Sequence, residues 1–421
     1  MTLIHSASQL LTLSGGPQRG RALGRLGIVE DGAVLVGENG ILAVGRTSAL
    51  LAQYPNEERL DAQRRVVMPG LIDPHTHLVW AGDRAIEFEM RLEGKSYQEI
   101  HAAGGGILST VKATRAASFQ ELFDQSRQRA EAMTAHGTTT AEAKSGYGLD
   151  MESELKQLEV LLSLNKTGPL EILPTYMGAH AVPPEYHSRA DEYVTFLCER
   201  ALPEIRSWWD MHAVSSPLPF VDVFCEEGAF DLAQSRRILE AARSLGFPLK
   251  IHADEFVNLG GTSLAAELGA VSADHLVKTS ASDIKALAAS QTAAVALPCT
   301  PFGLGDPEYT PAHAILDAGG LLALASDLNP GTAWCGNMQF VIALACRSMR
   351  LTPAQAIAAA TINAAAAIGR QDDLGSIEPG KQADLLILSV NDYRHLGYRF
   401  GTNLVDTVIK KGKIINPGRP C

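Results

Sequence analysis

The stretch "MPGLIDPHTHLVWAGDR", residues 68–84, places two histidines one residue apart at the end of an apolar run. In a β-strand, residues i and i+2 point to the same face, so His75 and His77 project to one side. Two imidazoles in that arrangement can bind one metal ion. The alternative is that backbone groups and water satisfy both rings near a strand end. The rest of the sequence decides between these two interpretations.

Eight apolar segments of strand length recur along the chain, and stretches with helical periodicity at residues 119–136, 151–164 and 231–245 separate some of them. The eight segments are "VVMPGLIDPHTHLV", "TTTAEAKS", "LEILPTYMGAH", "FVDVFCEEG", "PLKIHADEF", "AVSADHLV", "TAAVALPCTP" and "LLALASDLNPG". Near-continuous apolar strands joined by helices indicate a parallel sheet covered on both faces. Eight such units over residues 68–370 predict an α/β protein with a (β/α)8 barrel of the TIM type.

The two ends of the chain share a different texture. Short alternating runs with glycine and Asn-Gly turn signals occupy residues 27–67, among them "GAVLVGENGILAVG". The same period-2 pattern returns after Gly375 in "KQADLLILSV" and "LVDTVIKKGKII". We therefore predict a small, β-sandwich-like domain composed of residues 1–67 plus 371–421, beside the barrel at residues 68–370.

The composition indicates a globular chain without a polyanionic partner. Its 421 residues carry a formal net charge of −11, and 46% of them are hydrophobic. Nucleic-acid binding depends on clustered Lys and Arg, so we expect no nucleic-acid partner. The six cysteines form no C-x-x-C pair, which favours reduced thiols. Because the sequence shows neither a signal-peptide pattern nor an apolar run of ~18 residues, we expect a cytoplasmic protein without membrane contact.

Polar residues recur at the C-terminal ends of the predicted strands. They are His180, His252, Glu255, His275 and Asp327. In a (β/α)8 barrel those ends converge on one face, where such folds build their active sites. Neutral imidazoles with one carboxylate form a ligand set suited to Zn²⁺ or Fe²⁺, with a position left for water. We therefore predict a metal ion bound by His75, His77, His252 and Asp327.

These residues also resemble a known group of enzymes. The motif "PGLIDPHTH", the strand-end His252 and His275, and "SDLNPG" look like the amidohydrolase superfamily, metal-dependent hydrolases on a (β/α)8 barrel with a composite β domain. More narrowly, the chain resembles the imidazolonepropionase family over essentially its whole length. The blocks that carry this likeness are "HTHLVWAGDRAIEFEMRLEGKSYQEI", "AAGGGILSTV", "EAKSGYGL", "MGAHAVPPEY", "IHADEF" and "ALASDLNPGT". The H-x-H pair alone specifies only the superfamily, whereas these blocks together are more specific.

The resemblance implies a reaction and a set of site residues. The family opens the ring of 4-imidazolone-5-propanoate with a metal-activated water, giving N-formimidoyl-L-glutamate in histidine degradation. The resemblance also implies one Zn or Fe ion on the four ligands above. It implies a small-molecule substrate site lined by Arg84, Tyr147, His180, Glu255, Asn329, Gly331 and Thr332.

A single ion is the better expectation. Two-metal members of the superfamily typically bridge their ions with a carboxylated lysine at the end of the fourth strand, and "FVDVFCEEG" contains none. Lys144 and Lys250 are the nearest lysines, but each lies on a different predicted strand. We interpret both as structural.

The individual substrate residues also have plainer interpretations. The planar fork of Arg84 suits a carboxylate, although an exposed arginine can simply be solvated. Tyr147 lies between glycines that permit close approach to a ligand, or it packs in an ordinary turn. His180 can donate to the substrate or be a satisfied interior histidine. The segment with Asn329, Gly331 and Thr332 offers hydrogen bonds, but it is equally typical of a turn.

Three residues are predicted to act in the reaction itself, namely Glu255, His275 and Asp327. Glu255 is the first choice to shuttle a proton to the leaving ring nitrogen, with a helix cap as its alternative role. His275 is interpreted as the group that polarises the carbonyl or as an auxiliary base. The sequence leaves open which of these two moves the proton.

Residues 103–110, "AGGGILST", hold three consecutive glycines without the pattern of a phosphate-binding loop. We interpret them as a mobile segment and as a candidate lid over the barrel mouth. Two other functions stay open: a cyclic deaminase of the same superfamily, and a non-catalytic barrel that serves as a scaffold. A homodimer is the expected assembly, because twofold dimers are the commonest oligomers.

Overall fold

The computed structural model describes every residue except 39, 96–98, 100–104, 215 and 416–421. Eight strands form one sheet in the order of the sequence, and every neighbouring pair runs parallel. They are β6 (Leu71–Asp73), β7 (Thr138–Lys144), β8 (Glu171–Ala179), β9 (Phe220–Cys225), β10 (Lys250–Ala253), β11 (Ser272–His275), β12 (Ala293–Ala296) and β13 (Leu322–Leu324). Each lies within one of the eight predicted segments, so the strand count is confirmed.

The sheet closes just beyond its first and last strands. Thr76 and Leu328 form an isolated parallel bridge, in which the His77 N–H donates to the Leu328 carbonyl at 2.9 Å. The Asp327 N–H donates to the His75 carbonyl at 3.2 Å. The barrel is therefore joined at its carboxyl end by the two segments that carry three of the predicted metal ligands.

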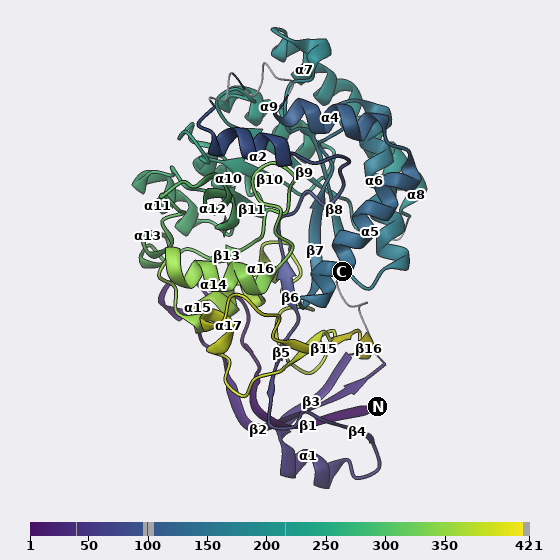
Figure 1. Cartoon of the computed structure of the whole chain (residues 1–421), viewed down its shortest axis with the longest axis vertical. Helices are drawn as coiled ribbons and strands as arrows, with labels where there is room; N and C mark the ends of the chain where they lie inside the picture. The colour runs from purple at the N-terminus through teal and green to yellow at the C-terminus, as the bar shows by residue number, and fades with distance from the viewer. Residues whose placement is uncertain (39, 96–98, 100–104, 215, 416–421) are drawn as a thin grey trace.

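Helices surround the barrel (Figure 1). The stretches predicted from periodicity are α5 (Phe119–Ala135), α6 (Met151–Thr167) and α9 (Leu232–Ser244). Further α-helices in the described part of residues 85–366 are α2 (Ala85–Leu92), α4 (Ile107–Ala116), α7 (Ala190–Phe196), α8 (Leu202–His212), α10 (Gly261–Leu268), α11 (Ala281–Ala289), α12 (Cys299–Leu304), α13 (Ala312–Asp317), α14 (Met338–Ser348), α15 (Pro353–Ala359) and α16 (Ile362–Ala366). Helix α5 begins after Ser118, which forms a capping box with Glu121.

Both ends of the chain build a second, mixed sheet, as the returning period-2 pattern predicts. Its strands are β1 (Thr2–Leu11), β2 (Ile28–Gly37), β3 (Gly40–Arg46), β4 (Glu58–Asp61), β5 (Val66–Pro69), β14 (Leu385–Leu388), β15 (Val405–Lys410) and β16 (Lys413–Ile415). Helices α1 (Thr47–Gln53) and α17 (His395–Tyr398) accompany them. In Figure 1 this sheet lies at the end of the molecule opposite α4 and α7.

One predicted strand is in fact two. The segment "VVMPGLIDPHTHLV" divides into β5, which pairs with β1 and β14, and β6, which pairs with β7. The chain thus crosses from the terminal sheet to the barrel at Gly70. The domain boundaries after residues 67 and 370 stay a prediction.

The predicted glycine-rich lid falls only partly within the structure. Residues 103 and 104 lie outside the described residues, whereas Ile107–Ala116 is helix α4 with Gly106 at its N-cap. Within the described part of the chain, no helix is long and apolar enough to cross a membrane. The five cysteines found there are all free thiols.

Candidate active site

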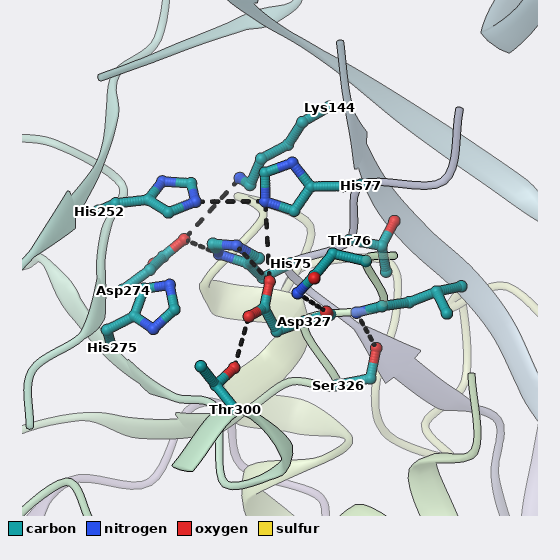
Figure 2. Close-up of polar contacts among 12 residues, drawn as sticks. His75, Thr76, His77, Lys144, His252, Asp274, His275, Thr300, Ser326 and Asp327 are labelled. Carbon is teal, nitrogen blue, oxygen red and sulfur yellow. Dashed lines mark hydrogen bonds and ion pairs between the residues drawn. The ribbon is translucent and has the colours of Figure 1, made fainter. Parts of the chain in front are cut away.

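The predicted ligands His75, His77 and Asp327 meet where the barrel closes. Oδ1 of Asp327 lies 3.4 Å from His75 Nε2 and 3.7 Å from His77 Nε2. Figure 2 shows the carboxylate facing both rings, with Thr300 donating to its other oxygen. Asp327 has a φ of 56°, a left-handed conformation that few residues other than glycine adopt. The closure therefore sets the direction of this carboxylate.

His252 completes the predicted set from β10. Its Nε2 lies 3.4 Å from Nε2 of His77, and its ring centroid is 4.4 Å from that of His75. His75 Nε2 is buried and has no hydrogen-bond partner. A buried polar atom without a partner costs ~1–3 kcal/mol, and a cation shared by these nitrogens would remove that cost. The four residues therefore fit a metal ion.

His275 lies close enough to His75 and His252 to share a metal ion with them. Ligand atoms of His75, His252 and His275 all lie within 4.8 Å of one another, as do those of His75, His77 and Asp327. His275 also has a left-handed backbone, with a φ of 79°. It is thus a further potential ligand as well as a candidate base.

Two aspartates behind the rings were missed by the sequence interpretation. His75 Nδ1 donates to Oδ2 of Asp274 at 2.6 Å, and His252 Nδ1 lies 3.1 Å from Oδ2 of Asp222. A carboxylate at Nδ1 holds that nitrogen protonated and leaves Nε2 free to bind a metal. The available signal was an acid inside a strand, which stands alone among apolar residues in "FVDVF" but lies beside other polar residues in "SADH".

Burial favours the neutral form of four histidines at this site. It lowers the pKa of His75, His77 and His275 well below the ordinary value, and it lowers the pKa of His180 to about 3. Neutral imidazole is the form that binds metals. Burial raises the pKa of Asp327 to about 6, against the lowering effect of its hydrogen bond from Thr300.

Glu255 lies beyond the end of β10, with Oε2 3.6 Å from His275 Nε2. Burial, together with the charges of Asp327 and Glu226, raises the pKa of Glu255 well above its ordinary value. A carboxyl group with a raised pKa keeps its proton to a higher pH than an ordinary glutamic acid does, which suits a group that donates as well as accepts. Glu255 and His275, the two candidates for the proton shuttle, are therefore neighbours.

Arg84, His180 and Thr332 line one cleft of about 740 Å³, together with Phe224 and Phe256. The Arg84 Nε and Nη2 groups lie 2.8 and 2.7 Å from Oε2 of Glu87, which sequence analysis did not single out. A Cβ added to Gly331 would lie 2.3 Å from Arg84 Nη1, so a glycine is needed for this close approach. The guanidinium group of Arg84 therefore lies at the wall of the cleft, where Glu87 fixes its position.

The Asn329 side chain shapes the segment beside Arg84. Its Oδ1 accepts from the backbone N–H groups of Gly331 at 2.8 Å and Thr332 at 2.9 Å, and its Nδ2 donates to the Asp327 carbonyl at 2.7 Å. The segment is therefore a turn, as one interpretation held, and it also borders the cleft.

Tyr147 and His180 lie against the metal ligands. The Tyr147 ring centroid is 5.7 Å from that of His77, and His180 stacks on His77 at 4.8 Å. His180 Nδ1 donates to the Gly146 carbonyl at 3.0 Å, which in a neutral ring leaves Nε2 as an acceptor. Burial raises the pKa of Tyr147, so the phenol keeps its proton.

Comparison with known proteins gives a consistent result. The model of the amidohydrolase family matches residues 66–415. An adenosine deaminase from Xanthomonas campestris with bound zinc superposes with a TM-score of 0.70 at 20% identity, covering 98% of this chain and 92% of that one. A triazine hydrolase variant superposes with a TM-score of 0.74 at 16% identity, covering 98% and 94%. At such identities the superpositions show the fold alone.

The barrel, the histidine cluster and the matching model define the class: the chain belongs to the amidohydrolase family. Imidazolonepropionases of Herpetosiphon aurantiacus and Chloroflexus aggregans are 49% and 50% identical to it, over 98% of this chain and 96% and 98% of theirs. Within the amidohydrolases it belongs to the imidazolonepropionase family. The family and the cluster together indicate a metal ion in the site.

Proposed function

We propose that this chain hydrolyses the ring of 4-imidazolone-5-propanoate to N-formimidoyl-L-glutamate in histidine degradation. The full-length similarity to imidazolonepropionases supports the reaction class. The observation that carries the proposal is the site itself: imidazoles and one carboxylate gather at the barrel's carboxyl end, next to a cleft that holds Arg84. The substrate carries a carboxylate and a cyclic amide, and the site offers a partner for each.

His75, His77, His252 and Asp327 would hold one ion, Zn²⁺ or Fe²⁺, because both accept mixed imidazole and carboxylate ligands. A bound ion of this kind lowers the pKa of water toward ~7 and polarises a carbonyl. Two-metal members of the superfamily typically bridge their ions with a carboxylated lysine. Here the nearby Lys144 is already paired with Glu142 and Asp222, which supports a single ion.

The protein's own residues would orient the substrate. Arg84 receives the propionate carboxylate, since Nη1 faces Gly331 while the other donors contact Glu87. Tyr147 and His180 flank the ring of the substrate beside His77. Asn329 holds the N–H groups of Gly331 and Thr332 in the adjacent turn.

Proton transfer is assigned to the neighbouring Glu255 and His275. Glu255, whose pKa is raised by burial, would donate a proton to the leaving ring nitrogen. His275 is the second candidate, because its Nε2 lies 3.6 Å from that carboxyl group. Asp327 takes part as a ligand and as a charge that acts on Glu255.

Turnover of 4-imidazolone-5-propanoate by the purified protein tests the proposal. The substrate's ultraviolet absorption should fall, N-formimidoyl-L-glutamate should appear by mass, and metal analysis of the same sample should give about one ion per chain. Ammonia release from a heterocycle would point instead to a cyclic deaminase. Metal-replete protein without turnover would overturn the assigned substrate, and protein that takes up no metal would favour the scaffold alternative.

A cytoplasmic location and a homodimer belong to the same proposal. The free thiols of all five described cysteines are in keeping with a reducing compartment. Cell fractionation and light scattering of the purified protein would test the two statements separately.

A further inference from the structure

Lys144 is a completely buried cation at the end of β7. Its Nζ lies 2.7 Å from Oε1 of Glu142, 2.8 Å from Oδ2 of Asp222 and 3.9 Å from Oδ2 of Asp274. A buried charge is tolerated only when it is paired. This pairing raises the pKa of Lys144, so the ammonium group stays charged.

Two of these carboxylates are the ones that face metal-binding histidines. Asp274 accepts from His75 Nδ1 at 2.6 Å, and Asp222 lies 3.1 Å from His252 Nδ1. In Figure 2 Lys144 lies on the side of the rings away from Thr300, with a dashed line to Asp274. One ammonium group thus contacts the carboxylates behind two of the proposed ligands, His75 and His252.

We propose that Lys144 is a positioning residue for the metal centre, holding Asp222 and Asp274 in place so that His252 and His75 keep their Nε2 lone pairs directed at the ion. The inference rests on the proposed metal ligands. It replaces the interpretation of Lys144 as merely structural. Without the ammonium group, only Asp274 of these three buried carboxylates would keep an ion pair with a lysine, Lys250, and their mutual repulsion would displace them from the rings.

Lys250 provides a matched control. It is also completely buried, on β10, and it donates to Ser272 Oγ at 2.6 Å and to the Ala367 carbonyl at 3.1 Å. Its Nζ lies 3.7 Å from Oδ2 of Asp274, and no ion pair joins it to Asp222 among the described residues. Lys250→Met therefore removes a similar buried charge but reaches only one of the two carboxylate–histidine pairs.

The experiment compares Co²⁺ binding by metal-free wild type, Lys144→Met and Lys250→Met, together with the thermal unfolding of each metal-free protein. Outer partners of metal ligands commonly contribute about 10- to 100-fold to affinity, so we expect Lys144→Met to raise the Co²⁺ Kd by that factor. The Co²⁺ absorption spectrum should change as well. Lys250→Met should show a smaller rise at a comparable loss of thermal stability.

Equal Co²⁺ affinity for Lys144→Met and wild type, or a loss no larger than that of Lys250→Met, would overturn the inference. If Lys144→Met does not fold, the double variant Glu142→Gln/Lys144→Met removes a buried pair together, which is less costly than removing one partner. That variant should still bind Co²⁺ weakly, and near-normal binding would overturn the inference too. Wild type that binds no Co²⁺ would instead refute the proposed ligand set.

Discussion

Asp327 takes part both in closing the barrel and in the metal site. Its backbone N–H donates to the His75 carbonyl, and its carboxylate faces the rings of His75 and His77. Asp327→Ala should lower bound metal and turnover together. Since the loss of an outer partner already costs about 10- to 100-fold in affinity, the loss of a ligand should cost at least that much. Metal analysis and steady-state rates measure the two effects, and full metal content with normal turnover would remove Asp327 from the ligand set.

Glu255 should separate metal binding from proton transfer. Glu255→Gln keeps the shape of the side chain but removes the proton that its raised pKa preserves. Positioned acid–base groups contribute about 10²- to 10⁴-fold to rate, so kcat should fall by such a factor while metal content stays near that of the wild type. Near-normal kcat would transfer the shuttle role to His275.

Gly331 tests the substrate contact of Arg84. In Gly331→Ala the new Cβ would lie 2.3 Å from Nη1 of Arg84, so the guanidinium must move. Hydrogen bonds to charged groups contribute about 1.5–3 kcal/mol, so KM for the carboxylate substrate should rise about 10- to 100-fold. The matched control is Gly401→Ala, where nothing lies within 4 Å of the added Cβ. A KM equal to that of the control would contradict the assignment.

At the scale of the elements, helix α9 illustrates how local sequence fixes a boundary. Asp231 Oδ1 accepts from the Gln234 N–H at 2.8 Å, and the Gln234 side chain accepts from the Asp231 N–H at 3.1 Å. Asp231→Ala should lower the free energy of unfolding by ~1 kcal/mol, as the loss of an N-cap usually does. Urea unfolding of this variant and of Asp231→Asn, which keeps an acceptor, would measure the cap; equal losses would show that it contributes little.

The barrel strands were largely predictable from the sequence, whereas the buried ion pairs of Lys144 with Asp222 and Asp274 were not. Apolar runs bounded by turn signals located all eight barrel strands, and strand-end residues such as His252 and Asp327 follow from where those strands stop. Asp222 is a single polar residue in an apolar strand, whereas Lys144 and Asp274 lie in strands that contain other polar residues, so nothing in the sequence sets them apart. Asp222 and Asp274 reach Lys144 from other strands, so only the closed barrel reveals that they pair with it. The division of one apolar run into β5 and β6 likewise depends on which sheet each half joins.

At the scale of the whole molecule, Glu171 connects the barrel to the terminal sheet. It begins β8, and its Oε2 lies 2.9 Å from Lys410 Nζ on β15 and 3.3 Å from Lys411 Nζ. Its Oε1 accepts from Arg370 at 3.0 Å. Side-chain exposure is 12% for Glu171 and 8% for Lys410, so solvent screens this contact less than a surface ion pair.

The ion pairs of Glu171 should make the free energy of unfolding depend on pH. Burial alone would raise the pKa of Glu171, but Lys410, Gln382 and Arg370 outweigh it and lower the pKa below the ordinary value of 4.5. A carboxyl group whose pKa is lower in the folded state stabilises the fold above the unfolded-state pKa, and it loses that contribution as pH falls below it. Glu171→Gln should therefore be less stable than wild type at pH 7, and the difference should shrink as pH falls from about 5 to about 3. Unfolding curves across that range, with the exposed Glu159→Gln as control, measure it. A difference that stays constant with pH would show that the charge of Glu171 does not hold the two sheets together.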